Sequence, residues 1–290
     1  MVVKASTITF KQTIIRRHRH LLFVLLCTAG FNLAGCDEQA APTFNTRALE
    51  VPKGITYPPP SATVQETEPF VKTILNFDHP NIKPHLLLAN DPTVLFVELS
   101  NQNTTPAVII NTQTGLSAMD ALNKNDLDVV LGSGFVTTLH SLQPVGLLRV
   151  NGETHSPPQL HGYTRVLGVN DKGIGVVNIN AYQRDLFHSA LQVGPGIVEE
   201  GRLDISVREL QRPKYFRSFV AICEGRWLGG VSLTPMHLHT LGEQLLDYFA
   251  DRRWRCKDVV NLAGDREALL AIKLDNGRIA FHGDPETHKV

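Results

Sequence analysis

The chain has 290 residues, and its 28 lysines and arginines balance its 28 aspartates and glutamates. A chain of this length can bury a substantial core, as one large domain or two small ones. Since basic residues are not in excess, the chain lacks the charge of a typical nucleic-acid-binding protein, and we expect no nucleic-acid partner.

The N-terminal 35 residues have the composition of a signal peptide. They carry five basic side chains and no acidic ones, and an apolar stretch runs from Leu21 to Leu33. This stretch is shorter and more interrupted than the roughly 20 apolar residues that span a membrane. Leu33-Ala34-Gly35-Cys36 resembles the lipobox of bacterial lipoproteins, where the signal is cut before an acylated cysteine. We predict a lipoprotein signal peptide over residues 1–35 and lipidation at Cys36; the alternative is an uncleaved anchor or a buried cysteine.

Removal of this segment would leave 255 residues with 23 basic and 28 acidic side chains, a net charge near −5. Asp37 resembles the signal that retains enteric lipoproteins in the inner membrane. We therefore expect a lipid-anchored protein of the cell envelope that faces the periplasm, with the inner membrane favoured. Residues 36–68 are rich in proline, and polyproline is a stiff spacer. They are predicted to form a tether, with the folded domain over residues 69–290.

Short runs of β-forming residues, separated by turn residues, dominate the predicted domain. Asn151-Gly152 is a strong hairpin signal, because both residues tolerate a positive φ. Asp171-Lys172-Gly173 marks a second hairpin turn. The expected strands cover residues 93–99, 107–111, 129–131, 145–150, 166–169, 175–179, 191–193, 219–222, 227–233, 259–262, 268–274 and 278–281.

Two helices are expected among these strands. A short one covers residues 117–122, and a longer one runs from Pro235 to about Asp251. Thr234 can cap the longer helix with its hydroxyl, and proline suits the first helical position. Its apolar residues recur at helical spacing. Because strands outnumber helices, we predict an α+β fold with a mixed, mainly antiparallel sheet and few packed helices.

Four cysteines occur in the chain. Cys27 would leave with the signal peptide and Cys36 would carry the lipid. Cys223 and Cys256 then remain as an even pair in an oxidising compartment. A disulfide between them would close a loop of roughly 34 residues, worth about 3–4 kcal/mol in the chain-entropy model. Two buried free thiols are the alternative.

The segment Asn261-Leu262-Ala263-Gly264-Asp265-Arg266-Glu267 lies between two apolar runs. In this setting it resembles the N-L-D-G-G-x-S segment of the phosphodiester glycosidase family. That family includes a lysosomal enzyme that removes N-acetylglucosamine from a sugar phosphodiester. Here Ala263 stands at the family's aspartate position and Glu267 at its serine position.

Other segments resemble the family in the family's order, over roughly residues 90–290. Gly132-Ser133-Gly134-Phe135 follows a predicted strand, as the family's N-G-G-F-F does, with a glycine at the asparagine position. Residues 144–152 are similar to its P-x-G-l-l-v-x-x-G hairpin, and residues 191–201 to its q-x-G-P-x-L-v-x-x-G segment. Residues 217–222 resemble its R-t-a-i-G segment and keep the arginine. The resemblance implies a phosphodiester glycosidase-like domain.

Cleavage of a glycosidic bond beside a phosphate requires that the phosphate charge is held, usually by arginine or by backbone N–H groups. Arg217 is the candidate phosphate ligand, and a structural arginine paired with a carboxylate is the alternative. Ser133 and Gly134 follow a strand end, where their N–H groups can face a ligand, although a tight turn would account for them equally well. Asn261 is a further candidate for substrate binding.

Glycosidic cleavage also requires a carboxylate for the oxocarbenium ion and for proton transfer. Asp265 and Glu267 can supply it from displaced positions, which implies hydrolysis of sugar 1-phosphodiester linkages in a glycan with reduced or altered activity. A solvated charged turn is the alternative interpretation of these residues. Ala263 favours the other hypothesis, a non-catalytic glycan-binding or scaffold lipoprotein on the same fold.

We expect no cofactor and no metal. The sequence has no Gly-rich P-loop, no G-x-S-x-G elbow and no H-E-x-x-H motif. His237 and His239 lie two apart in the predicted helix, which places them on opposite sides of it. The partners that remain are a glycan or sugar phosphodiester and, through the lipid, the membrane.

Overall fold

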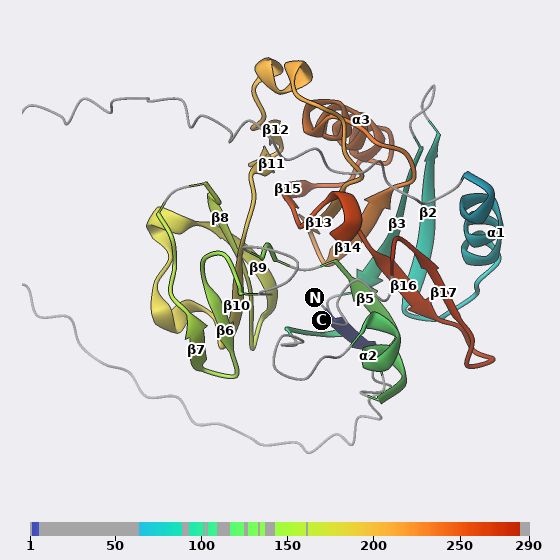
Figure 1. The fold of residues 1–290 in the computed structure, drawn as a ribbon, viewed down its shortest axis with the longest axis horizontal. Coiled ribbons are helices and arrows are strands. Elements are labelled where there is room, and N and C mark those ends of the chain that lie inside the picture. Colours follow the sequence, from blue (N-terminus) through green and yellow to red (C-terminus); the bar gives the residue numbers. More distant parts are fainter. Residues whose placement is uncertain are drawn as a thin grey trace, which may run out of the picture. The chain divides into compact units, whose positions relative to one another are not determined.

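The computed structural model describes residues 2–5, 64–88, 93–100, 102, 104–108, 117–124, 127–132, 134–136, 143–160 and 162–284. All of them belong to one compact unit, formed by residues 1–8 and 60–290 (Figure 1). The predicted lipidation site Cys36, Asp37 and residues 37–63 of the predicted tether lie outside the described residues, and so does Ser133. None of the described helices is long and apolar enough to span a membrane.

Strands dominate the described part of the chain, where they form three sheets in which neighbouring strands run antiparallel. The largest sheet has the order β12-β11-β15-β13-β14-β3-β2. Its strands are β2 (Ile82–Leu88), β3 (Thr93–Ser100), β11 (Gly196–Glu199), β12 (Arg202–Leu203), β13 (Ser218–Cys223), β14 (Arg226–Ser232) and β15 (Cys256–Asn261).

Two five-stranded sheets complete the set. The sheet with the order β7-β6-β10-β8-β9 consists of β6 (Leu148–Val150), β7 (Glu153–Ser156), β8 (Arg165–Asn170), β9 (Gly173–Asn178) and β10 (Ser189–Val193). The sheet with the order β17-β16-β5-β1-β4 consists of β1 (Val2–Ala5), β4 (Thr104–Ala107), β5 (Val129–Leu131), β16 (Leu270–Lys273) and β17 (Ile279–His282).

Among the described residues, three α-helices pack against these sheets: α1 (Val64–Leu75), α2 (Ala118–Lys124) and α3 (Leu238–Asp251). The α+β class with mainly antiparallel sheets and few helices is therefore confirmed. The helix α3 lies against β11, β12 and β15 (Figure 1). Its apolar face is buried there, in a cluster that includes Leu241, Leu245 and Phe249. The helical spacing of these residues is what the sequence predicts.

The start of α3 corrects a prediction. The sequence indicates a helix from Pro235 with Thr234 as its cap, but α3 begins at Leu238 and His237 is its N-cap residue. Met236 forms an isolated β-bridge with Tyr215, and its N–H donates to the Tyr215 carbonyl oxygen (2.8 Å). These bonds keep the backbone extended where proline and threonine would otherwise favour a first turn.

Two segments that the sequence places outside the folded domain form part of it. Residues 64–68, at the end of the predicted tether, form the first part of α1, whose Phe70 and Ile74 are buried against the main core. Val2–Ala5, inside the predicted signal peptide, pair with β4 on one side and β5 on the other. Of the strand expected over residues 107–111, residues 109–111 lie outside the described residues, and Ala107 is the last residue of β4 (Thr104–Ala107).

Candidate functional site

The segment 261–267 links β15 to β16 and lies where several strand ends meet. The N–H of Leu262 donates to the Ser218 carbonyl oxygen (2.9 Å) at the start of β13. On another side, the N–H of Gly132, just after β5, donates to the Leu269 carbonyl oxygen (2.8 Å). The ends of β15 and β5 and the start of β13 therefore converge near this segment. Residues up to 137 apart in the sequence, such as Gly132 and Leu269, meet here because the sheets bring them together.

Asn261 is buried at the end of β15, and only 4% of it is exposed. Its N–H donates to the Pro195 carbonyl oxygen (3.1 Å), and its side-chain Nδ2 donates to the Gly194 carbonyl oxygen (3.2 Å). Its Oδ1 is buried and has no hydrogen-bond partner among the described residues. A buried acceptor without a partner is costly, which makes it a group that a ligand or a water could satisfy.

Ala263, at the aspartate position of the family segment, is fully buried. Its carbonyl oxygen accepts a 2.5 Å hydrogen bond from Ser218 Oγ. A Cβ atom at Gly132 would collide with the Glu267 carbonyl oxygen and would lie 3.0 Å from Ser218 Oγ. The position of the family's asparagine therefore has no room for a side chain, because the backbone of the Glu267 turn occupies that space.

Glu267 ends a short 3₁₀ turn, η4 (Asp265–Glu267), in which Asp265 has φ +57°. Burial raises the pKa of the Glu267 carboxyl to about 7, and the negative charge of Asp265 adds to the shift. A carboxyl with this pKa exchanges protons near neutral pH, which a solvated carboxyl does not. Of the candidate site residues, Glu267 is therefore suited to proton transfer near neutral pH.

Tyr163 is a residue of this site that the sequence reasoning missed. Burial raises the pKa of its hydroxyl, and the charge of Glu267 raises it further, so the two groups are within electrostatic reach. The Tyr163 ring stacks on Phe135, with 4.3 Å between ring centroids. Phe135 belongs to the family-like segment, but Tyr163 lies in no motif, because only the packing of β8 beside β10 brings it here.

Arg217 is held by protein groups. Its Nε donates to the Met236 carbonyl oxygen (3.0 Å) and its Nη2 to Glu209 Oε1 (3.1 Å). Glu209, in the 3₁₀ turn η3 (Val207–Gln211), also accepts from the His239 N–H (3.1 Å) at the start of α3. Burial lowers the pKa of the guanidinium, while Glu209 and, more weakly, Asp265 act to raise it. These contacts match the structural alternative for Arg217, and its phosphate-binding role stays a prediction.

Gly134 lies after β5 and is partly exposed, and a Cβ atom there would lie 3.3 Å from the end of the Leu191 side chain and 3.6 Å from the Gln192 carbonyl oxygen. Its role in substrate binding stays a prediction. The structure thus brings Asn261, Glu267 and Tyr163 toward one region.

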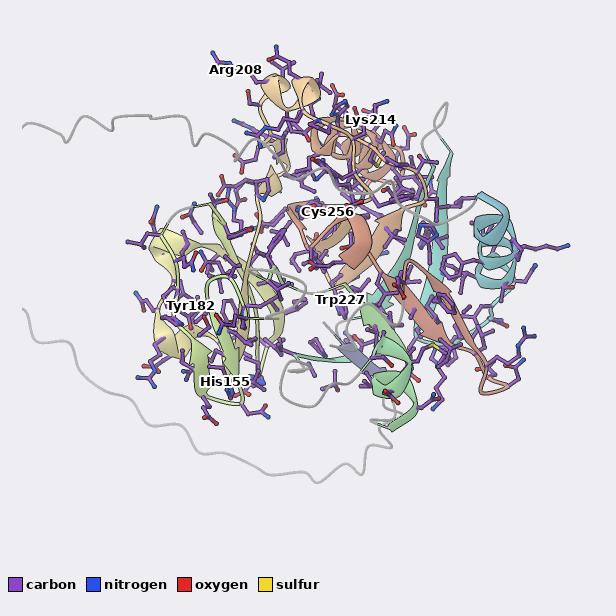
Figure 2. All side chains as sticks on the ribbon, viewed as in Figure 1. His155, Tyr182, Arg208, Lys214, Trp227 and Cys256 are labelled. Carbon is purple, nitrogen blue, oxygen red and sulfur yellow. A yellow bond between two sulfur atoms is a disulfide. The ribbon has the colours of Figure 1, made fainter. Side chains whose placement is uncertain are left out.

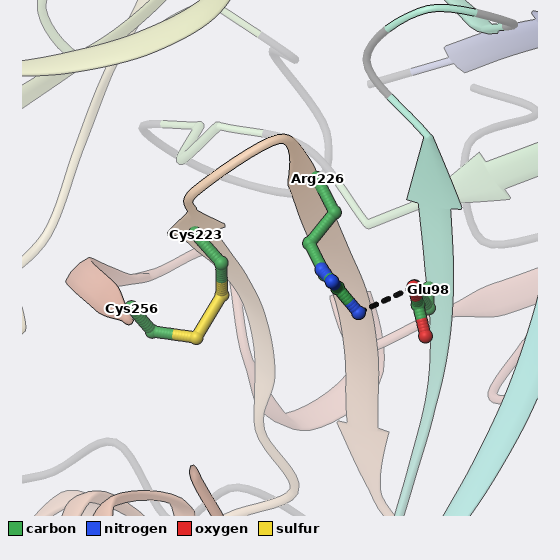
Figure 3. Close-up of a disulfide and its surroundings, with 4 residues drawn as sticks. All are labelled: Glu98, Cys223, Arg226 and Cys256. Atoms are coloured by element: carbon green, nitrogen blue, oxygen red, sulfur yellow. Dashed lines mark hydrogen bonds and ion pairs between the residues drawn. A yellow bond between two sulfur atoms is a disulfide. The ribbon is translucent and has the colours of Figure 1, made fainter. Parts of the chain in front are cut away.

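Cys223 and Cys256 form a disulfide that joins the end of β13 to the start of β15 (Figure 3). It lies at the opposite end of this strand pair from Asn261, because Cys223 faces Cys256 in the register while Phe219 faces Asn261. The disulfide is therefore remote from the candidate site.

In the described part of the chain, no group of three or more histidine, cysteine, aspartate or glutamate side chains is placed to hold a metal ion. His239 Nδ1 lies 3.2 Å from Glu243, and His237 Nδ1 lies 3.8 Å from Glu209. His282 is buried near Phe70 and Phe216, and this burial lowers its pKa to about 4.

No family model matches the sequence, and no curated protein matches it. Among solved structures, the zebrafish N-acetylglucosamine-1-phosphodiester alpha-N-acetylglucosaminidase catalytic domain, auto-inhibited by its pro-peptide, matches 70% of this chain and 76% of its own length. The TM-score is 0.52 and the identity 14%. A hypothetical protein from Synechocystis matches 72% of this chain and 62% of its own, with a TM-score of 0.43 and 12% identity. The chain therefore has a fold distantly similar to that of a phosphodiester glycosidase domain.

Proposed function

We propose that this protein is a divergent member of the phosphodiester glycosidase family, a lipid-anchored envelope hydrolase that cleaves sugar 1-phosphodiester linkages in glycans, with Glu267 as its acid–base group. The observation that carries this proposal is the buried Glu267 carboxyl, with its pKa of about 7, in the segment that resembles the family's site. The fold supports it, because the similar zebrafish domain is by its name an N-acetylglucosamine-1-phosphodiester alpha-N-acetylglucosaminidase.

The chemistry requires a group that can exchange a proton near neutral pH. With a pKa of about 7, Glu267 is protonated in about half of the molecules at pH 7. Its ionised form can take a proton from an attacking water, and its protonated form can give one to the leaving oxygen. The nearby Tyr163 hydroxyl keeps its proton at neutral pH, because its pKa is raised, and can donate a hydrogen bond to the substrate.

Binding of the substrate would use the groups around this carboxyl. The Asn261 Oδ1 atom lacks a protein partner among the described residues and can accept from a sugar hydroxyl. Arg217 is within electrostatic reach of Asp265 and adds positive charge on that side of the turn. A phosphodiester carries negative charge, so this guanidinium favours its approach.

Hydrolysis is tested with the purified full-length protein in detergent and a panel of sugar 1-phosphodiesters, by measuring the sugar released. We expect turnover by the wild type and a loss of about a hundredfold or more in Glu267→Gln, since positioned proton transfer contributes about 10²–10⁴-fold. Asp265→Asn is the matched control, and it should lose less because it only modulates Glu267. Wild-type protein without turnover on every substrate would overturn the proposal.

Two observations favour a second candidate, a glycan-binding or scaffold lipoprotein without catalysis. Ala263 is fully buried at the family's aspartate position, and Arg217 already binds Glu209 and Met236. This candidate predicts that the same phosphodiesters bind without being cleaved. Binding is measured by calorimetry with the same panel, and turnover that Glu267→Gln abolishes would exclude it.

The membrane anchor is part of the proposal, and the motif around Cys36 supports it. The variant Cys36→Ser should incorporate no radiolabelled palmitate and should appear in the soluble fraction of the cell envelope. A variant that stays in the membrane fraction through its own apolar segment would contradict the lipoprotein interpretation, while leaving the enzymatic proposal untouched.

A further inference from the structure

A cavity of about 210 Å³ lies at the disulfide end of the strand pair, away from the candidate site. It is larger than the roughly 30 Å³ that one water occupies in the liquid, so it has room for a small ligand group. Two chain segments form its walls: the turn between β13 and β14, and the connection from α3 to β15. The lining residues are Cys223, Glu224, Arg226, Arg253, Trp254 and Arg255.

The walls of this cavity are fixed. The Cys223–Cys256 disulfide joins the two segments directly (Figure 3). Arg226 is held on one side by Glu98, whose Oε1 accepts from its Nη1 at 2.8 Å (Figure 3), and on the other by the Trp254 ring, 5.0 Å from its guanidinium carbon. A guanidinium held in this way loses little freedom when a ligand binds.

Arg253 occupies a backbone position at which glycine is usual. The N–H of Arg253 donates to the Ala250 carbonyl oxygen (3.0 Å) and the N–H of Trp254 to the Phe249 carbonyl oxygen (2.8 Å). These are the two bonds of a Schellman motif that ends α3, and the ring contact between Phe249 and Trp254 completes it. Arg253 is its left-handed residue, with φ +54°, where a side chain is disfavoured.

The charges of the cavity do not cancel. Arg226 is paired with Glu98. Arg255 lies 3.7 Å from Glu224, and the side chains of Arg255 and Glu224 are well exposed. Arg253 has no carboxylate partner among the described residues. Three guanidinium groups therefore surround the space, with one carboxylate in its lining.

We propose that this cavity binds a tetrahedral oxyanion, the phosphoryl or sulfate group of a small molecule or a saccharide. Planar guanidinium groups match the oxygens of such an anion through pairs of charge-assisted hydrogen bonds. Arg253 occupies a position that favours glycine, and its guanidinium supplies a positive charge that no carboxylate of the described residues neutralises. This site is separate from Glu267 and does not depend on the hydrolase proposal.

Binding is measured on the full-length protein by calorimetry and by Trp254 fluorescence, at constant ionic strength adjusted with sodium chloride. The other tryptophan, Trp227, is only 1% exposed, so a fluorescence change on titration reports mainly Trp254. Inorganic phosphate, inorganic sulfate and glucose 1-phosphate are the three probes. We expect saturable binding of at least one. Tighter binding of glucose 1-phosphate identifies a phosphorylated saccharide as the ligand class, and equal binding identifies the free ion.

The variant Arg253→Gly tests the site without endangering the fold, since glycine is favoured at this position. We expect its affinity to fall about tenfold or more, because a hydrogen bond to a charged group is worth about 1.5–3 kcal/mol. Arg208→Ala is the control: it removes the same charge from the exposed η3 turn, beyond the far end of α3 (Figure 2).

The two variants give a clear decision. A selective loss in Arg253→Gly, with Arg208→Ala binding as the wild type does, supports the site. Absence of saturable binding of all three probes by the wild type overturns the proposal. Equal losses in Arg253→Gly and Arg208→Ala overturn it too, because they would reflect net charge alone.

Discussion

The two ends of the β13–β15 strand pair have opposite chemistry. At the end with Asn261, strand termini from two sheets surround Glu267 with protein, and burial raises the pKa of its carboxyl. At the end with the disulfide, arginine side chains reach toward solvent around an open cavity. The same six-residue strands therefore separate two ends of opposite chemistry by about 17 Å, since a strand rises about 3.4 Å per residue.

The difference lies in how each end is held together. The Asn261 end depends on close backbone approach and hydrogen bonds, which leave no room for a side chain at position 132. The disulfide end is held by a covalent bond and by the ion pair of Glu98 and Arg226, and its arginine side chains stay accessible. A buried site therefore requires packing from several elements, whereas an exposed site requires only that the residues around it are held in place.

The largest expected effect is on the disulfide end. The double variant Cys223→Ser/Cys256→Ser should lose about 4 kcal/mol of unfolding free energy, because the bond closes a long loop, with a sequence separation of 33. Urea denaturation measures the loss, and wild-type protein in reducing buffer should unfold at the same urea concentration as the double variant. An unchanged midpoint would show that this end does not depend on its covalent bond.

Glu267 should make stability depend on pH. Its pKa is higher in the folded protein, about 7, than its ordinary value of 4.5, so folding favours the protonated form. Its contribution is therefore fully present below pH 4.5 and is lost as pH rises through 7. At pH 8, Glu267→Gln should be more stable than the wild type by about 3 kcal/mol, and this difference should vanish near pH 4.5.

Unfolding in urea at pH 4.5 and pH 8 measures this difference. The control is Glu224→Gln, which removes an exposed carboxylate at the disulfide end and is measured at the same two pH values. Buried His282 titrates in both the wild type and the variants, so it cancels when they are compared. The same pH dependence in both variants would remove the contrast between the two ends.

Gly132→Ala should destabilise the Asn261 end by about 2 kcal/mol, as overpacking of a tight site does. The added methyl group would collide with the Glu267 carbonyl oxygen, which belongs to the backbone and moves only if the turn moves. Gly134→Ala is the matched control, since the one tight contact of its methyl group would be with the flexible end of Leu191, and the Gln192 carbonyl oxygen would lie at 3.6 Å, an ordinary contact distance. Thermal unfolding compares the two, and equal losses would contradict the close approach at Gly132.

The smallest expected effect concerns the ion pair at the disulfide end. A double-mutant cycle on Glu98→Ala and Arg226→Ala should give a coupling of about 0.5–1 kcal/mol that falls with added salt, because the pair is partly exposed. Glu224 and Arg255, both far more exposed, should show no measurable coupling. A salt-insensitive coupling of Glu98 and Arg226 would mean that this ion pair is less hydrated than the exposure of its side chains indicates.

Much of the local structure follows from the sequence. Asn151 and Gly152 both have the positive φ that their hairpin turn requires, and β6 and β7 flank them. The apolar face of α3 is buried as its spacing predicts. The start of α3 does not follow, because the bridge between Met236 and Tyr215 overrides the local preference of Thr234 and Pro235. A pairing partner 21 residues away leaves no trace in a local pattern.

The sequence by itself determined the α+β class, the turns, the location of the family-like segment and the two cysteines that could pair. Only the tertiary structure decided which residues matter within them. It buried much of Glu267 and brought Tyr163 within its electrostatic reach, it committed Arg217 to Glu209, and it left Arg253 without a carboxylate partner among the described residues. The physical reason is that desolvation and charge pairing depend on neighbours in space, whereas propensity and periodicity depend on neighbours in the chain.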